Sequence, residues 1–515
     1  MKIAVYDIGT NSIHLLIVEI RKDLSFEILD HEKDATRIGD GSFKKKKLSG
    51  AAMKRAFAVM DRFTKIAKKC GVRRTLAVAT SAVREATNGA AFIEALRKRT
   101  GVKVRVISGR EEGRLIFLAA RSAVETRGEK ALVIDIGGGS MELVLGDSQK
   151  HYFLESYRLG VARLTDLFIR NDPPSKKEIK RLEQHIESQI RFGIKAVRRQ
   201  EFSMVIGTAG TMIALALVVH QSMKSRELQL INNFTLHREA LEKFHKRLIR
   251  TSLKERLKIP GLEPKRADLL VAGSVLVTTL MRMLKMKRIT ISDKGIREGL
   301  VLDFIEKNKK NIKDAQPGTG IREKSVRQLG RRCAYNEAHA EQVARLAEVL
   351  FDATARLHRL GERDKELLRY ASLLHDIGHY VSFRKHHKHS YYLIVNSNLD
   401  GFSPEEIEIM GAAARSHRKP VTKTISGCFV GKEGRRTISV LGALLRIADG
   451  LDRSYTGVVK SMDCRLTPSA LSLTLKVSQD AELEMWQAKE RADLFEALFN
   501  RKLVLQSVRI NKKKG

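Results

Sequence analysis

Near the start of the chain, short apolar runs alternate with longer segments whose apolar residues are spaced as on one face of a helix. The runs KIAVYDIG and SIHLLIVEI, residues 2–9 and 12–20, predict two strands joined by a tight turn that contains glycine. Residues 50–69 place apolar side chains three and four positions apart, which predicts an amphipathic helix. Gly71 is a suitable residue to end that helix. This part of the chain therefore mixes strands and helices.

The same order of elements returns in the next part of the chain. The segment ALVIDIGGGSMELVLG, residues 131–146, predicts a second strand, turn and strand, and an amphipathic helical pattern covers residues 178–197. We therefore expect two α/β halves, residues 1–127 and 128–307, of the layered kind in which helices cover sheets.

The pattern changes after the second half. Residues 308–328 are polar and charged and contain Pro317-Gly318-Thr319-Gly320, which predicts a linker. Residues 329–515 show long helical periodicity and hold more than half of the histidines. We expect an all-α domain there, followed by a short mixed C-terminal tail that begins near Arg465 and has a frayed basic end.

The charge of the chain is unusual and narrows the class of partner. The 515 residues include 96 Lys and Arg against 59 Asp and Glu, a net charge of +37. A basic surface favours polyanions, although basic composition can also be general to a host organism. Aromatic residues make up 6% of the chain and include one Trp, so base-stacking platforms are sparse and sequence-specific nucleic-acid binding is not expected. A long phosphate chain or a nucleotide fits this composition better.

The remaining composition bears on the cellular compartment. No uninterrupted apolar stretch reaches the roughly 18 residues that a membrane span needs. The four cysteines are scattered and form no C-x-x-C pair, which is typical of a reducing compartment. We therefore expect a cytoplasmic protein.

Two predicted turns have nearly the same sequence, DIGTNS at residues 7–12 and DIGGGS at residues 135–140. Glycines let an anion approach the backbone N–H groups of such a turn. An aspartate repels phosphate but suits Mg²⁺ or Mn²⁺ held through water, so Asp7 and Asp135 are candidate metal residues. A third turn, GTAGT, precedes an apolar helix. The predicted phosphate-binding residues are Gly9, Thr10, Asn11, Ser12, Gly137, Gly138, Gly139, Ser140, Gly207, Thr208, Gly210 and Thr211.

The ordered motifs resemble the actin, sugar kinase and heat-shock ATPase superfamily, and within it the exopolyphosphatase / guanosine pentaphosphate phosphohydrolase (Ppx/GppA) family. The resemblance spans about 300 residues and is carried by DIGTNSIHLLI (7–17), ATSAVREATN (79–88), ISGREEGRLIF (107–117), VIDIGGGSMELV (133–144), LGVARLTD (159–166), GTAGT (207–211) and SDKGIREGLV (292–301). It implies two actin/sugar-kinase-like halves that form a cleft.

The resemblance also implies chemistry. The family hydrolyses terminal phosphoanhydride bonds, which requires an activated water, a metal and positive groups. The second Glu of the S-G-x-E-E motif, the general base in the family, falls on Glu112, with Glu111 beside it. We expect raised pKa values for both glutamates near a polyanionic substrate. Asp135 matches the metal-associated aspartate, and Arg84 matches a phosphate-contacting arginine.

The histidine-rich region carries a second possible site. His339, the pair His375-Asp376 and Asp449 lie in helical patterns and resemble the HD phosphohydrolase arrangement, in which they ligate one divalent metal. His389 and His417 would complete a second metal site, whereas His379, His386 and His387 are interpreted as surface or core residues. Whether this domain hydrolyses a phosphate compound, responds to a nucleotide or serves as a scaffold stays open.

Four functions fit these patterns. The first is a Mg²⁺-dependent exopolyphosphatase, and the second is the sister reaction that converts pppGpp to ppGpp in the stringent response. A kinase that moves phosphate between polyphosphate and a nucleotide uses the same fold. A non-catalytic sensor of an alarmone or polyphosphate belongs to a different class. The family resemblance further implies a homodimer.

Overall fold

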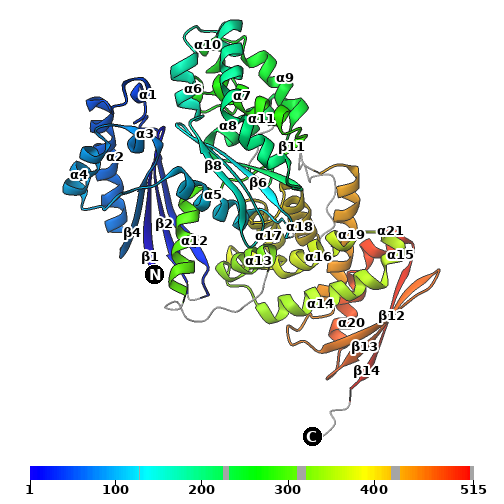
Figure 1. The fold of residues 1–515 in the computed structure, drawn as a ribbon. Helices are drawn as coiled ribbons and strands as arrows, with labels where there is room; N and C mark the ends of the chain where they lie inside the picture. Colours follow the sequence, from blue (N-terminus) through cyan, green and yellow to red (C-terminus); the bar gives the residue numbers. More distant parts are fainter. Residues whose placement is uncertain (22, 127, 224–230, 310–319, 419–429, 511–515) are drawn as a thin grey trace. The chain divides into compact units, whose positions relative to one another are not determined.

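The computed structural model describes residues 1–21, 23–126, 128–223, 231–309, 320–418 and 430–510 (Figure 1). The chain divides into two compact units, Met1–Gly318 and Thr319–Gly515. The two predicted α/β halves therefore belong to one unit.

The first sheet has five strands in the order β3-β2-β1-β4-β5. Its strands are β1 (Lys2–Ile8), β2 (Ile13–Ile20), β3 (Phe26–Asp34), β4 (Arg74–Ala79) and β5 (Arg105–Val106). The helices that follow these strands are α1 (Ser42–Lys45), α2 (Gly50–Lys69), α3 (Ser81–Glu85) and α4 (Gly89–Thr100). Tyr6 and Ile8 from the sheet pack in one core with Phe63 of α2 and Phe92 of α4.

The second sheet repeats this topology and adds one strand. Its order is β10-β11-β9-β6-β7-β8, so that β8-β7-β6-β9-β11 corresponds to β3-β2-β1-β4-β5, with β10 antiparallel at the edge. The strands are β6 (Ala131–Ile136), β7 (Met141–Gly146), β8 (His151–Tyr157), β9 (Met204–Thr208), β10 (Thr235–His237) and β11 (Arg288–Ile291). The repeated topology confirms the predicted pair of actin/sugar-kinase-like α/β halves.

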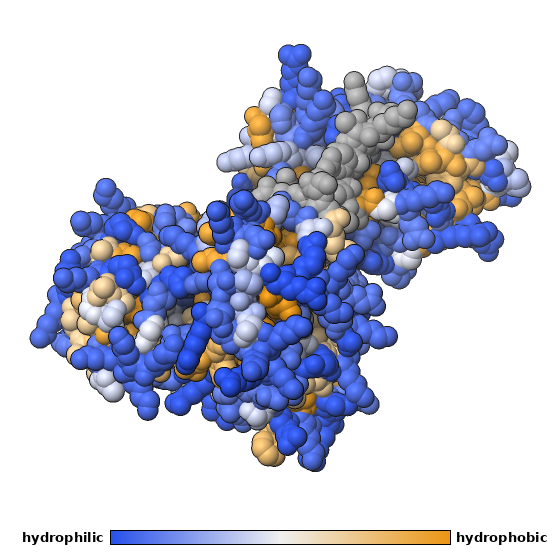
Figure 2. All heavy atoms as spheres, turned by 90° about the horizontal axis from the view of Figure 1, so that it is seen from above, coloured by the Kyte–Doolittle hydropathy of each residue, from blue (hydrophilic) through white to orange (hydrophobic). Residues whose placement is uncertain are grey.

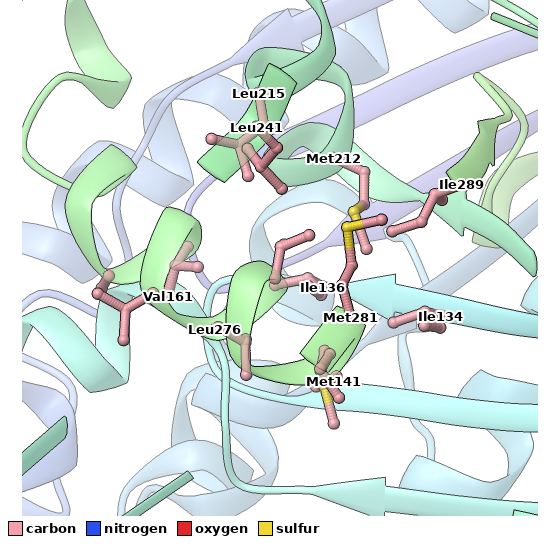
Figure 3. Packing of buried hydrophobic residues seen from close by; sticks show 14 of the residues in the cluster. Ile134, Ile136, Met141, Val161, Met212, Leu215, Leu241, Leu276, Met281 and Ile289 are labelled. Carbon is pink, nitrogen blue, oxygen red and sulfur yellow. The ribbon is translucent and has the colours of Figure 1, made fainter. Parts of the chain in front are cut away.

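Helices cover the second sheet in a large apolar core (Figure 3). They are α6 (Val161–Phe168), α7 (Lys176–Arg198), α8 (Ala209–Met223), α9 (Arg238–Leu248) and α11 (Leu270–Met283). The short helices α10 (Leu253–Arg256) and η1 (Pro264–Arg266) lie between α9 and α11 in sequence and contribute no residue to this core. Ile134 and Met141 of the sheet lie with Met212 of α8 and with Leu276 and Met281 of α11 in this core.

Two helices cross between the halves. The helix α5 (Gly109–Ala123) follows the first sheet in sequence, yet its Ile116 packs against Val133 and Val144 of the second sheet. The helix α12 (Ile296–Asn308) follows the second sheet, yet its Phe304 packs in a core with Ile3 and Val5 of the first. The predicted boundary at residues 127 and 128 separates the strands of the two sheets but not the helices that cover them.

The predicted linker is too long at its C-terminal end. The helix α12 extends to Asn308, and α13 (Ile321–Arg332) begins directly after Gly320. Val326 and Leu329 bury one face of α13, which the surrounding charges obscure in the sequence. Residues 310–319 lie outside the described residues.

The described residues of the second unit are mostly helical up to residue 450, and a small sheet follows. Its helices are α13, α14 (Glu337–Ala353), α15 (Ala355–His358), α16 (Glu362–Leu374), η3 (Ile377–Tyr380), α17 (His386–Val395), α18 (Pro404–Ser416), α19 (Lys432–Gly450), α20 (Glu482–Glu490) and α21 (Asp493–Phe499). A sheet of β12 (Val459–Leu466), β13 (Ala470–Val477) and β14 (Lys502–Arg509) forms the mixed tail, which begins slightly earlier than predicted.

The surface agrees with the composition. On the face drawn in Figure 2, hydrophilic residues cover most of the surface and apolar residues form scattered patches. No helix in the described part of the chain has both the length and the apolar character that a membrane span requires.

The crossing of α5 and α12 gives a test of the fold. A Cβ atom on Gly299 of α12 would lie 2.1 Å from the carbonyl oxygen of Leu115 in α5. We expect Gly299→Ala to lower the free energy of unfolding by about 1–3 kcal/mol, because the two backbones must separate. Urea unfolding of the whole chain, followed by circular dichroism, measures this change.

Gly50→Ala is the matched control, because a Cβ atom there meets no other atom within 4 Å and alanine favours a helix. Equal loss of stability in both variants would contradict the crossing of α5 over α12.

Candidate active site and metal centre

The two repeated glycine turns have the same internal geometry and meet each other. The N–H of Gly9 donates to the carbonyl oxygen of Ser12 at 3.0 Å, and the N–H of Gly137 donates to that of Ser140 at 3.1 Å. A Cβ atom on Gly138 would lie 3.0 Å from Cβ of Thr10. The close approach explains the need for glycine at this position.

The neighbouring residues join the two turns. The hydroxyl oxygens of Thr10 and Ser81 are 2.9 Å apart, and a Cβ atom on Gly139 would clash with both. Asn11 lies in the same contact, because its backbone nitrogen is 3.3 Å from the position of a Cβ on Gly138. The structure thus brings the predicted residues of the first two turns together.

The third turn joins this group through the aspartate of the second. The hydroxyl of Thr208, at the end of β9, donates a hydrogen bond to Oδ1 of Asp135. A Cβ atom on Gly210 would lie 2.2 Å from the guanidinium of Arg266, so glycine makes room for this cation. Arg266 therefore places positive charge at the N-terminus of α8, beside Gly210.

Several carboxylates are buried around the turns. The exposed fraction is 8% for Glu112, 7% for Asp135, 1% for Glu142 and 4% for Glu298. Oδ1 of Asp7 and Oε2 of Glu142 are buried without a hydrogen-bond partner among the described residues. This arrangement leaves negative charge uncompensated and favours either a bound cation or protonation.

The pKa values of these groups follow from their burial. Burial raises the pKa of Asp7 to about 7 and that of Asp135 to about 6. Burial also raises the pKa of Glu112 to about 8, against the opposing charge of Arg84, and the charges of Asp135 and Asp7 add to the increase. A carboxylate with such a pKa accepts protons near neutral pH.

Glu112 is held in place by Arg84. It lies in the first turn of α5, and Nη1 of Arg84 is 3.2 Å from its Oε2. The same nitrogen of Arg84 donates to the carbonyl oxygen of Ile107 at 2.7 Å, which fixes the guanidinium. The structure therefore brings Glu112 and Arg84 together as predicted.

Glu111 does not share this environment, and the expected raised pKa is wrong for this residue. Arg114 donates to both of its carboxylate oxygens, at 2.9 and 3.1 Å, and these bonds lower the pKa of Glu111. Adjacent residues of a helix do not face the same way, so only Glu112 points to the buried carboxylates.

The sequence analysis missed Glu142 and Glu298. In the second hairpin Asp135 pairs with Glu142, as Asp7 pairs with His14 in the first, so the register of the hairpin places Glu142 beside Asp135. Ser156 donates to Oε1 of Glu142 at 2.7 Å. Glu298 accepts a hydrogen bond from the N–H of Gly295, the capping pattern of GIRE in the sequence.

A cavity of about 750 Å³ adjoins these groups. It reaches Ser140 of the second turn and Ser156, the partner of Glu142. Its charged lining consists of the cations Lys46, Arg84, Arg110, Arg158 and Arg163 and of Glu85 and Glu155, so that cations predominate although Glu85 pairs with two of the arginines. The cavity is therefore suited to an anion with several charges.

The cleft fits Mg²⁺ or Mn²⁺ held by few protein oxygens. Asp7 offers an unpartnered carboxylate oxygen, and Asp135 lies at the equivalent position of the second half. Among the described residues, groups of three such ligand atoms within 4.8 Å of one another occur only in the second unit. Mg²⁺ commonly binds one or two carboxylates and completes its coordination with water and substrate phosphates.

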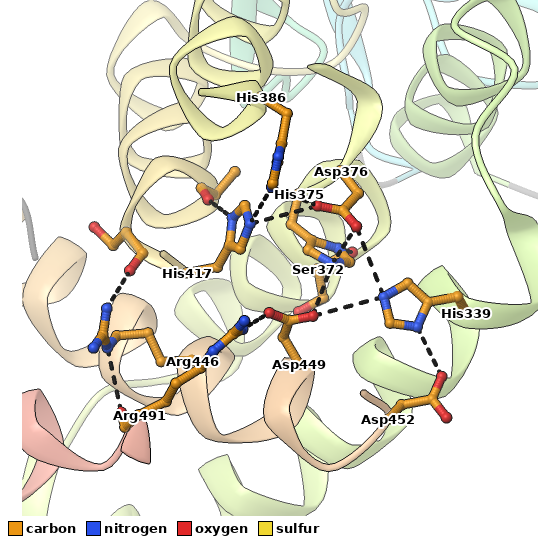
Figure 4. A network of polar contacts seen from close by, with 12 residues as sticks. His339, Ser372, His375, Asp376, His386, His417, Arg446, Asp449, Asp452 and Arg491 are labelled. Carbon is orange, nitrogen blue, oxygen red and sulfur yellow. Dashed lines mark hydrogen bonds and ion pairs between the residues drawn. The ribbon is translucent and has the colours of Figure 1, made fainter. Parts of the chain in front are cut away.

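In the second unit, histidines and aspartates gather between α14, α16, α18 and α19 (Figure 4). Nε2 of His375 lies 3.5 Å and Nε2 of His339 lies 3.7 Å from Oδ1 of Asp449. The ligand atoms of these three residues all lie within 4.8 Å of one another. Four predicted residues, His339, His375, Asp376 and Asp449, therefore meet in one cluster.

A second group lies on the other side of Asp376. Its Oδ1 is 3.3 Å from Nε2 of His386, 3.4 Å from Nε2 of His417 and 3.6 Å from Nε2 of His379. Asp376, His379 and His386 form the second set of ligand atoms within 4.8 Å. His417 is thus placed as predicted.

The structure does not bring the predicted residue His389 into this group, and His386 lies there instead. The helix α17 begins at His386 and buries residues 386, 390 and 394 on one face, whereas His389 is half-buried beside that face. His386 and His379 had been interpreted as ordinary surface or core residues. The four-residue spacing of His386, Ser390 and Ile394 is the signal that identifies the correct histidine.

Hydrogen bonds orient the imidazoles of the cluster. Nδ1 of His375, His386 and His417 donates to the carbonyl oxygens of Ser372, Phe383 and Ala414, at 2.7, 3.0 and 2.6 Å. Nδ1 of His339 lies 2.7 Å from the carboxylate of Asp452, a residue the sequence analysis missed. These bonds turn each Nε2 toward Asp376 or Asp449, as in metal sites whose ligands are fixed by outer hydrogen bonds.

Burial also favours the neutral, metal-binding form of the imidazoles in this cluster. Burial lowers the pKa of His375, His386 and His417, which favours the neutral imidazole that binds metals. Burial would raise the pKa of Asp376, but His375 and the other neighbouring groups hold it well below its usual range.

Both units match models of one family. Residues 16–308 match the Ppx/GppA phosphatase family, and residues 321–496 match Ppx/GppA phosphatase, domain III. An exopolyphosphatase structure from Cytophaga hutchinsonii is 29% identical with a TM-score of 0.57, and the match covers 60% of this chain and 98% of that one. The Aquifex aeolicus family member is 26% identical with a TM-score of 0.52, over 60% of this chain and 98% of that one. With its paired glycine turns, buried carboxylates and a family match over more than half of its length, the chain belongs to the Ppx/GppA phosphatase family.

Proposed function

We propose that the first unit is an exopolyphosphatase, which removes the terminal phosphate of inorganic polyphosphate. The observation that carries this proposal is the position of Glu112. It is a buried carboxylate with a raised pKa, next to Arg84, which lines a cavity that reaches Ser140 of the second glycine turn. The exopolyphosphatase from C. hutchinsonii, 29% identical, supports the same activity.

The residues divide the reaction among them. Backbone N–H groups at residues 10–12 and 138–140 of the two turns hold the terminal phosphate, and Arg84 neutralises its charge. Glu112 accepts a proton from water as the water oxygen bonds to the terminal phosphorus. The bridging P–O bond then breaks, and the polyphosphate leaves one phosphate shorter. Asp7 and Asp135 would hold Mg²⁺ or Mn²⁺, which supplies positive charge to the phosphate oxygens when bound.

The cavity favours a phosphate chain over the alternative substrate, pppGpp. Two rings line the cavity: the guanidinium of Arg163 lies 4.0 Å from the centre of the Phe43 ring, and Tyr157 packs against the apolar core of the second half. A guanine base would need a free ring for stacking. The excess of cations over carboxylates in the lining of the cavity suits a chain whose every unit carries a negative charge.

The role of Glu112 has a direct test. We expect Glu112→Gln to lower kcat for phosphate release from long-chain polyphosphate by about 10²–10⁴, the contribution typical of a general base. Glu111→Gln is the matched control and should keep nearly full activity, because Glu111 pairs with Arg114 instead. Full activity in Glu112→Gln would contradict the proposal. The same assay with pppGpp, run in competition, decides between the two substrates.

The pH dependence gives a second test. Because Glu112 must be ionised to accept a proton, we expect kcat/KM to rise with pH through an apparent pKa near 8, far above that of an ordinary glutamate. The charge of Arg84 lowers the pKa of Glu112, so Arg84→Gln should move this midpoint to higher pH. A midpoint near pH 4.5 in the wild type, or one unchanged by Arg84→Gln, would overturn the assignment.

A further inference from the structure

We propose that the exposed face of α7 binds the backbone of single-stranded nucleic acid without regard to its sequence, while rings at the edge of that face stack on the bases. No residue of α7 is among those that line the cavity of the proposed active site, so this surface is separate from it. The proposal therefore does not depend on the reaction of the first unit. Three observations support it: the phase of the cations along the helix, the positions of the acidic residues, and the exposed rings.

The cations of α7 follow one face of the helix. The opposite face packs into the core of the second half through Leu182, Ile186 and Ile190, which turns the first face toward solvent. Residues three, four and seven positions apart share a face of a helix. The exposed cations have this spacing, and together they form what we call the α7 stripe: Lys177, Lys180, Arg181, Arg191, Lys195, Arg198 and the C-terminal cap Arg199.

The acidic residues of α7 lie outside the stripe. Glu178 is buried and belongs to the capping box at the start of the helix. Glu183 and Glu187 are half-buried, and Glu187 pairs with Arg282 of α11 at 2.6 Å. The helix therefore directs its negative charges away from the face that carries its positive ones.

The charge of the stripe is uncompensated. Gln184 and Ser188, the exposed residues between its two groups of cations, are neutral. In the part of the chain that the structure describes, no ion pair of a stripe cation is found. Arg191 and Lys195, like Lys195 and Arg199, are four residues apart, a spacing at which like charges repel and destabilise a helix. A polyanion bound along the stripe would offset this repulsion.

The length of the stripe suits several phosphates of one strand. A helix rises about 1.5 Å per residue, so residues 177–199 extend over about 33 Å. The phosphates of one nucleic-acid strand follow one another at about 3.4 Å along the axis of a stacked helix. About ten nucleotides can therefore lie along α7.

Aromatic rings lie at one edge of the stripe. Phe192 is 81% exposed, more than any other large apolar side chain among the described residues. His185, two helical turns before it, lies about 10 Å away along the axis and contacts Phe168 of α6 at 4.7 Å between ring centres. Burial lowers the pKa of His185, which keeps its ring uncharged near neutral pH. Rings beside a row of cations are the usual platform for the bases of a single strand, because every base can stack.

The rings also distinguish among polyanions. Inorganic polyphosphate has no planar group that could stack on Phe192, and the bases of a duplex are already stacked on one another. A membrane surface is not favoured, because the apolar face of α7 is buried in the protein core and cannot enter a bilayer. Contacts to phosphates carry no sequence information, so binding without sequence preference is expected.

The stripe is tested by fluorescence anisotropy of a labelled oligouridine of about 15 nucleotides with the whole chain at several salt concentrations. The logarithm of the binding constant falls with the logarithm of the salt concentration by about 0.7 for each phosphate contacted on a single strand, so seven contacts give a slope of about −5. We expect Lys177→Gln with Lys195→Gln to weaken binding and to make this slope shallower by about 1.4.

Lys65→Gln with Lys69→Gln is the matched control, because it removes the same charge from exposed positions of α2. This variant should keep the slope of the wild type. An equal change of slope in both double variants would show that only the overall charge matters and would overturn the assignment to α7. Circular dichroism checks that all variants are folded.

The stacking contact is tested with Phe192→Ala. We expect about tenfold weaker binding of oligouridine with an unchanged salt slope, because stacking releases no counterions. Phe192→Tyr keeps a ring and should bind as the wild type does. Phe383→Ala removes a ring that is 75% exposed in the second unit and should have no effect. Equal affinity in Phe192→Ala and the wild type would overturn the proposed stacking.

Competing probes decide the class of polyanion. They are unlabelled oligothymidine, duplex RNA, inorganic polyphosphate of similar length and vesicles with anionic lipids. We expect the two single strands to compete best and to respond to Phe192→Ala. If polyphosphate, duplex RNA or vesicles bound more tightly than oligouridine, and lost affinity with the stripe cations but not with Phe192→Ala, the assignment to single-stranded nucleic acid would be overturned. None of these variants changes a residue of the proposed active site.

Discussion

The contact between the two glycine turns is the constraint on which the first unit depends. Each turn ends a central strand, and the absence of side chains at Gly138 and Gly139 lets the backbone of one half reach Thr10 and Ser81 of the other. Carboxylates at the ends of β1 and β6 are thereby drawn into one buried region. Their charge has little water around it, which explains both the raised pKa values and the affinity for a cation that the chemistry requires. The close contact of the two turns therefore forms the site and also makes it unfavourable for all of its carboxylates to be ionised without a bound cation.

The exchange of α5 and α12 between the sheets ties this contact to the rest of the unit. Because each helix packs on the sheet of the other half, the two cores are connected by more than a hinge. The second unit solves a related problem by different means. There the buried groups are mostly neutral imidazoles, and hydrogen bonds from Nδ1 to backbone carbonyls fix the ring orientations before any metal arrives.

Local patterns in the sequence were sufficient for the strands, the hairpin turns and the helices that bury one face. The pairing of the two turns followed from their repetition. The sheet against which α5 packs could not be predicted, because an amphipathic pattern shows that one face of a helix is buried but not which sheet covers it. Glu142 required the register of the hairpin, and the separation of Glu111 from Glu112 required the direction of each side chain on a helix. His386 was confused with His389 because the start of α17 sets its phase, and that start lies in a charged segment without a clear cap.

The contact between Arg84 and Glu112 links α3 to α5, the helix that packs against both sheets: its Leu115 lies in a core with the first sheet and its Ile116 in a core with the second. The charge of Arg84 lowers the pKa of Glu112, so the proton affinity of the base depends on how α3 and α5 are held beside each other. A substitution in either apolar core that shifted α5 would therefore change the protonation of Glu112 without altering the residue itself.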